Sequence, residues 1–155
     1  MKLRVISIGK VRQHFVLEGE AEYLKRLAPH LRLEILELDN EKHSSLPEPQ
    51  IIDRDSDLLL SKIKKERVLV VLDIGGKQLS SEMLASYIQK EMLHGTSLIN
   101  FAIGGTLGWN SAVKERADLL LSLSSFTFTY QLARLILIEQ LYRATTIMRG
   151  LPYHR

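Results

Sequence analysis

Residues 97–110 read SLINFAIGGTLGWN, an apolar run that leads directly into a glycine-rich turn. An uninterrupted apolar run of this kind is typical of a strand that is buried on both faces of a sheet. Glycines at the end of a strand let the backbone pass close to a ligand, where a side chain would clash. We therefore predict a ligand pocket at the end of this strand, although the glycines alone also fit an ordinary tight turn.

The segments on either side of this stretch alternate between strand and helix patterns. We predict strands over 2–9, 31–38, 67–73, 97–103 and 119–123, and helices over 15–27, 51–65, 81–95, 110–117 and 131–148. This alternation predicts one α/β domain over residues 1–155, with a mostly parallel sheet flanked by helices. Residues 73–77 are predicted as a loop, and residues 122–129 as the end of a strand that forms the second wall of the pocket.

The last predicted helix, residues 131–148, has apolar residues on nearly every side. A helix of this kind has to be covered on two sides. We expect the sheet to cover one side and a partner subunit the other, which predicts a homodimer.

Composition narrows the class of protein. The chain has 155 residues, 45% of them hydrophobic and 25% charged, which is ordinary for a globular domain, and it has no cysteine. The absence of cysteine excludes disulfides and cysteine metal sites. The chain starts with an alternating strand rather than a signal peptide, and no apolar run reaches membrane-spanning length. We expect a cytoplasmic protein with no membrane partner.

Positive charge is concentrated at the C-terminal end. From Phe126 onward there are four arginines and one acidic residue, Glu139. The planar guanidinium of arginine can donate two hydrogen bonds to a phosphate, so this region is a candidate polyanion site. The alternative is a solvated or salt-bridged helix face, and Glu139 and Arg143 have the spacing of such a pair.

The five histidines show no spacing typical of metal ligands, so we predict no metal. His154 differs from the others because it lies between Tyr153 and Arg155 at the end of the chain. An aromatic ring, an imidazole and a guanidinium together can stack on a base, move a proton and bind phosphate. The alternative for these three residues is a disordered terminus.

Several motifs occur together and in order along the chain. They are LDIGGK at 72–77, IGGTLG at 103–108, SLSSFTF at 122–128, LYRA at 141–144 and YHR at 153–155. In combination they resemble the ribosomal RNA large-subunit methyltransferase family H of the SPOUT superfamily. The similarity covers the whole chain, including its length and its first residues.

The resemblance implies a homodimeric α/β methyltransferase with a C-terminal trefoil knot that uses S-adenosylmethionine and no metal. Its substrate would be N3 of a pseudouridine in large-subunit (23S) ribosomal RNA, within the assembled ribosome. Carried over by motif, the cofactor-binding residues would be Leu72, Gly104, Leu123, Ser124, Ser125, Phe126, Thr127 and Phe128. Leu72, Leu123 and Phe128 can flank an adenine, and backbone groups can bind its polar edge.

The chain departs from the family at one position of the expected site. Thr129-Tyr130 stands where the family typically has a proline-histidine or serine-histidine pair before the last helix. A phenol is a weaker base than an imidazole near neutral pH. We therefore assign Tyr130 to substrate positioning, and Arg134 likewise. With Tyr153, His154 and Arg155 they form the predicted catalytic set.

Two other functions stay open at this point. The first is a non-catalytic, ribosome-associated RNA-binding protein that keeps the cofactor pocket but has lost its chemistry at Tyr130. The second is a small-molecule α/β enzyme in which the basic tail is incidental. It predicts cofactor binding without the salt-sensitive ribosome association that phosphate contacts produce.

Overall fold

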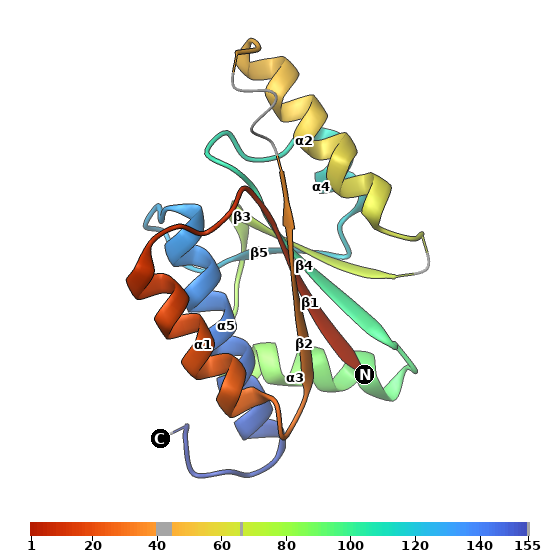
Figure 1. Ribbon diagram of the computed structural model, residues 1–155. Helices are drawn as coiled ribbons and strands as arrows, with labels where there is room; N and C mark the ends of the chain where they lie inside the picture. Colours follow the sequence, from red (N-terminus) through yellow and green to blue (C-terminus); the bar gives the residue numbers. More distant parts are fainter. Residues whose placement is uncertain (40–44, 66, 155) are drawn as a thin grey trace.

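The computed structural model describes residues 1–39, 45–65 and 67–154. Strands and helices alternate along the chain, as predicted (Figure 1). The elements are β1 (Lys2–Ile8), α1 (His14–Leu27), β2 (Arg32–Leu38), α2 (Glu48–Lys62), β3 (Val68–Gln78), α3 (Ser81–Leu93), β4 (Leu98–Ile103), α4 (Ser111–Arg116), β5 (Leu119–Ser122) and α5 (Tyr130–Met148).

The strands form one five-stranded sheet in the order β2-β1-β4-β3-β5. Every neighbouring pair is parallel. The predicted α/β class with a parallel sheet is therefore confirmed. Because all strands run the same way, the segments that follow β3, β4 and β5 meet at one edge of the sheet, which is where open α/β sheets bind ligands. The trefoil knot stays a prediction.

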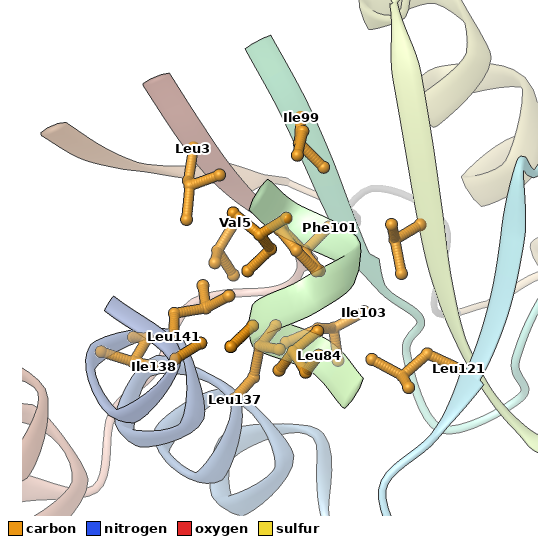
Figure 2. Packing of buried hydrophobic residues seen from close by; sticks show 14 residues of the cluster. Leu3, Val5, Leu84, Ile99, Phe101, Ile103, Leu121, Leu137, Ile138 and Leu141 are labelled. Atoms are coloured by element: carbon orange, nitrogen blue, oxygen red, sulfur yellow. The ribbon is translucent and has the colours of Figure 1, made fainter. Parts of the chain in front are cut away.

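Helices cover both faces of the sheet. On one face, α3 and α5 pack against β1 and β4, with Phe101 and Leu137 in the centre of the contact (Figure 2). On the other face, Leu59 of α2 and Val113 of α4 pack against Ile6 and Val71. These two apolar layers hold the sheet edge, and the segments that leave it, in a fixed position.

α5 is partly buried, with seven of its 19 residues fully buried and the others half-buried. None of its residues is exposed, and α1 and α3 both pack along it. Helices of the same chain thus supply part of the cover that α5 needs, and its other apolar residues stay half-buried. The homodimer stays a prediction.

β3 is longer than the sequence predicts. It continues through residues 73–77, which we expected to form a loop, and pairs with β5 across an irregularity between Leu72 and Lys77. Gly76 makes this pairing possible, since a Cβ there would lie 2.6 Å from the carbonyl carbon of Leu120. The loop predicted for residues 73–77 is therefore wrong, because Gly76 allows close contact between the two strands.

Two other boundaries differ from the prediction. α2 starts at Glu48 rather than at residue 51, because proline is tolerated in the first turn of a helix, where its missing N–H has no partner in any case. β5 stops at Ser122, so residues 123–129 form a loop rather than a strand. No helix in the described ranges is long and apolar enough to cross a membrane.

Candidate functional site

A cavity of about 780 Å³ lies at the edge of the sheet where β3, β4 and β5 end. It is lined by residues 72–74, 103–109, 114, 121–124, 126–131 and 133. The glycine turn after β4 and the loop after β5 are thus two walls of one cavity. Its volume is in the range of small-molecule and cofactor sites.

The glycine turn is held together by its own packing. Gly108 has a positive φ of 75°, and its N–H donates to the carbonyl oxygen of Gly105 over 3.1 Å. A Cβ on Gly104 would lie 3.2 Å from both the Cα of Gly108 and the indole Nε1 of Trp109. The close contact with buried Trp109 therefore favours glycine at position 104, in addition to any approach of a ligand.

Serines shape the loop that follows β5. The Ser122 hydroxyl donates to the carbonyl oxygen of Ser124, and the Ser124 hydroxyl accepts from the N–H of Phe126, both over 3.0 Å. Gln78, at the end of β3, donates from Nε2 to the hydroxyl of Ser125 over 3.2 Å. Hydrogen bonds from small polar side chains fix the loop in this way, and no bulky side chain has to fill the cavity to hold it.

Most of the predicted cofactor-binding residues line this cavity. Those that do are Leu72, Gly104, Leu123, Ser124, Phe126, Thr127 and Phe128. Ser125 does not line the cavity, and its exposed side chain accepts a hydrogen bond from Gln78 instead. The ring of Phe126 is 79% exposed, so it stands at the mouth of the cavity rather than inside it.

Tyr130 lies in the cavity wall at the start of α5. Its hydroxyl donates to the carbonyl oxygen of Lys10 over 2.8 Å. The next side chain, Gln131, accepts from the N–H groups of Arg12 and Gln13 at 2.9 and 3.1 Å. These contacts tie the loop after β1 to the cavity, and the oxygen of Tyr130 can still accept a hydrogen bond.

Arg134 occupies a different place from the one we expected. Its side chain is 2% exposed and does not line the cavity. It binds both carboxylate oxygens of Glu20, at 2.6 and 2.7 Å, and also Glu37 at 2.7 Å and the hydroxyl of Ser7 at 3.1 Å. Four elements meet at this guanidinium, so Arg134 connects α5 to α1, β1 and β2 rather than facing a substrate.

Glu37 in turn supports the loop beside the cavity. It accepts from the N–H of Val11 at 3.1 Å. Burial by itself would raise the pKa of Glu37, but the hydrogen bonds from Arg134 and Val11 outweigh that effect and hold the pKa below its ordinary value. The carboxylate is therefore charged at neutral pH.

The C-terminal tail packs against α3 and α5. The Tyr153 hydroxyl donates to Glu139 over 3.0 Å, and its ring lies 4.6 Å from the guanidinium carbon of Arg143. The His154 Nε2 atom is 2.6 Å from a carboxylate oxygen of Glu82. Neither tail residue lines the cavity, so one chain does not bring the predicted catalytic set together. Arg155 lies outside the described residues.

Sequence reasoning missed one feature of the cavity. Asp73 and Lys114 both line it, and they form an ion pair with 2.7 Å between Lys114 Nζ and Asp73 Oδ2. Asp73 was placed in a loop, and Lys114 was only one charge on a short predicted helix. Nothing in their spacing of 41 positions signals a contact, because the fold alone brings β3 and α4 together.

The comparisons with known proteins agree with this geometry. A family model described as "Predicted SPOUT methyltransferase" matches residues 1–154. The chain belongs to this SPOUT methyltransferase family. The resemblance seen in the sequence motifs is thereby confirmed.

Several relatives of this SPOUT methyltransferase match over their whole length. The protein named "Ribosomal RNA large subunit methyltransferase H" from Carboxydothermus hydrogenoformans is 42% identical, with 100% of both chains covered. The protein of the same name from Finegoldia magna is 43% identical, again with 100% of both covered.

A solved structure shares the fold. The tRNA (m1G37) methyltransferase from Aquifex aeolicus matches with a TM-score of 0.56, covering 99% of this chain and 72% of that one. Its sequence identity is 17%, so it supports the architecture alone.

SPOUT methyltransferases use S-adenosylmethionine, and the residues of the cavity fit such a ligand. Leu72, Leu123 and Phe128 supply apolar walls, and the loop after β5 places backbone groups among them. Within residues 1–39, 45–65 and 67–154, no group of three or more histidines and carboxylates is placed to hold a metal ion.

Proposed function

We propose that this protein transfers a methyl group from S-adenosylmethionine to N3 of a pseudouridine in large-subunit (23S) ribosomal RNA, on the assembled ribosome. The observation that carries the proposal is the full-length sequence identity of 42% to proteins named ribosomal RNA large subunit methyltransferase H. The cavity supports it, because the motif residues that suggested the resemblance line that cavity.

The cavity residues would hold and orient the cofactor. We assign the flanks of the adenine to Leu72, Leu123 and Phe128, and its polar edge to backbone groups of Gly104 and residues 124–126. When bound, S-adenosylmethionine supplies a methyl group on a positively charged sulfur, which is an activated leaving group. The protein then has to position that methyl group in line with the acceptor nitrogen and to exclude water.

The acceptor nitrogen must lose its proton as it gains the methyl group. Tyr130 is a polar side chain of the cavity wall, and its hydroxyl is oriented by the carbonyl oxygen of Lys10. We assign it to positioning the target base, by a hydrogen bond or by stacking. His154 stays a candidate for handling the proton, but only if a second copy of the chain brings it to the cavity.

A homodimer is part of the proposal. The tail and the cavity are separate within one chain, so we expect one subunit to hold the cofactor while its partner's surface helps to hold the RNA. Three exposed apolar side chains, Ile74, Leu107 and Phe126, line the mouth of the cavity. Apolar groups that gather on a surface in this way are typical of an interface. Because ribosomal RNA is the substrate, we place the protein in the cytoplasm.

The arginines of α5 and of its C-cap, Arg149, contribute less to RNA binding than their number suggests. Arg134 is buried, and Arg143 pairs with Glu139 over 2.8 Å, which is the salt-bridged alternative that its spacing allowed. Arg149 donates to the carbonyl oxygen of His30 but is otherwise exposed. We therefore expect the RNA contacts to be spread over both subunits.

The test is methyl transfer from labelled S-adenosylmethionine to ribosomes from a strain that lacks this activity, with the native protein and Tyr130→His side by side. We expect label in the large-subunit RNA with the native protein. Label with Tyr130→His alone would identify a binding protein whose chemistry was lost at that position. Cofactor binding without label in either case, and without salt-sensitive ribosome association, would point to a different substrate.

A further inference from the structure

We propose that Asp73 and Lys114 form a subsite for an α-amino acid zwitterion, and that they bind the amino-acid end of the cofactor. The inference rests on the proposed function, because it takes S-adenosylmethionine as the ligand of the cavity. It names the two residues that would let the cavity distinguish this cofactor from a nucleoside without an amino-acid group.

The first observation is the distribution of charge in the cavity. Among the described residues that line it, Asp73 and Lys114 are the charged ones, and all others are apolar or neutral. Asp73 comes from β3 and Lys114 from α4, so two different elements bring the two charges together. The ligand's amino-acid end carries one ammonium group and one carboxylate, which match this pair in sign and number.

The second observation is that the carboxylate is fixed and the ammonium group is adaptable. The side chain of Asp73 is 16% exposed, and its Oδ1 atom accepts a hydrogen bond from the N–H of Gly75 over 2.8 Å. Its other oxygen, Oδ2, faces the ammonium group of Lys114. Lys114 is 41% exposed and ends a flexible stem. Lys114 can therefore move aside to admit an ammonium group at Asp73 while it takes the ligand's carboxylate itself.

Protonation is consistent with this role. The hydrogen bond from Lys114 is the main cause that lowers the pKa of Asp73, and the Gly75 N–H acts in the same direction against burial. Asp73 is thus ionised at neutral pH and can accept from a ligand ammonium group. Charge-assisted hydrogen bonds of this type are stronger than neutral ones.

The pair also lies at a suitable place along the cavity. Asp73 follows Leu72 directly in β3, and Leu72 is one of the apolar walls assigned to the adenine. Lys114 belongs to α4, which begins shortly after the glycine turn. The cavity therefore has an apolar region and a charged region side by side, as a ligand with a purine at one end and a zwitterion at the other requires.

The competing explanation is that the ion pair only ties α4 to β3. That role predicts that loss of either charge changes stability, or changes the affinity for every ligand of the cavity alike. A zwitterion subsite instead predicts losses that depend on which groups the ligand carries. Three ligands separate the cases: S-adenosylmethionine, its decarboxylated form, and 5′-methylthioadenosine, which has no amino-acid part.

The experiment is isothermal titration calorimetry of each ligand with the full-length native protein, Asp73→Asn and Lys114→Gln. For Lys114→Gln we expect the affinity for S-adenosylmethionine to fall on the order of tenfold, the size of one charge-assisted hydrogen bond, with the other two ligands unchanged. For Asp73→Asn we expect a similar fall for both ligands that carry the ammonium group, and none for 5′-methylthioadenosine.

Lys77→Gln is the matched control, because it removes a lysine charge from the same strand as Asp73 but outside the cavity lining. It should leave all three affinities unchanged. The inference is overturned if the two cavity variants lower all three affinities equally, or lower none. If the native protein binds neither S-adenosylmethionine nor 5′-methylthioadenosine, the cofactor assignment itself fails, which distinguishes that result from failure of the subsite alone.

Discussion

At the scale of single residues, the buried guanidinium of Arg134 has the largest influence on the site. It holds Glu37, which binds the Val11 N–H and thereby supports the loop that contacts Tyr130. Its partner Glu20 lies 114 positions away in the sequence, so no local pattern reveals the ion pair. For this reason the sequence led us to read Arg134 as a substrate-facing cation, although it belongs to the interior.

Glu37→Gln tests this network through pH. Because the pKa of Glu37 in the folded protein lies below its ordinary value of 4.5, its charge stabilises the fold above pH 4.5, and that contribution is lost as the pH falls through the lowered pKa. We expect Glu37→Gln to reduce the free energy of unfolding by about 2 kcal/mol at pH 7. The difference from the native protein should shrink as the pH falls below 4.

Urea unfolding at several pH values measures this difference. The control is Glu22→Gln, which breaks an exposed ion pair with Arg26 and should change the stability far less than Glu37→Gln does. Equal losses for the two variants, or a Glu37→Gln penalty that persists unchanged in acid, would contradict the assigned role of Arg134 and Glu37.

At the scale of elements, apolar runs predicted the strands well because a parallel sheet buries both faces of its strands. The prediction failed where contact between two strands decides the outcome. Residues 73–77 carry two glycines and were read as a loop, yet they continue β3 because Gly76 allows the backbone of β5 to approach. The contact between Asp73 and Lys114 could not be predicted for the same reason, because it forms only when the fold brings β3 and α4 together. The glycine turn after β4, by contrast, indicated the cavity from the sequence alone.

The pair Gly76→Ala and Gly75→Ala tests the contact between β3 and β5. A Cβ at Gly76 would lie 2.6 to 2.8 Å from backbone atoms of Leu120 and Leu121, which cannot move without separating the strands. We expect Gly76→Ala to destabilise the protein by about 3 kcal/mol and to weaken cofactor binding, since both strands contribute residues to the cavity wall. A Cβ at Gly75 would meet only the Asp73 carboxylate, at 3.2 Å.

Thermal or urea unfolding of both variants, followed by titration with 5′-methylthioadenosine, provides the measurement. Gly75→Ala should stay within about 1 kcal/mol of the native protein. If Gly76→Ala proved as stable as Gly75→Ala, the irregular pairing of β3 with β5 would not be the reason for a glycine at that position.

At the scale of the whole molecule, the chain forms a complete core but an incomplete catalytic site. One side of α5 is buried within its own chain, against the sheet and against α1 and α3. The cavity and the tail, by contrast, lie on separate parts of the surface, and exposed apolar side chains line the cavity mouth. Assembly would therefore complete the catalytic site.

Phe126→Asp tests whether a partner covers that mouth. Phe126 is 79% exposed, and burying a phenylalanine side chain is worth about 2 kcal/mol for each copy, so its replacement by a charge should shift a dimer toward monomer by a factor of several hundred or more. Light scattering across a dilution series measures the shift. Leu93→Asp is the control, because Leu93 is 81% exposed at the end of α3 and does not line the cavity.

If both variants stayed dimeric, or if Leu93→Asp alone became monomeric, the interface would lie away from the cavity. A native protein that is monomeric at every concentration would remove the partner's tail from the proposed site, and the proton would then have to be handled by residues of one chain, with Tyr130 as the first to examine.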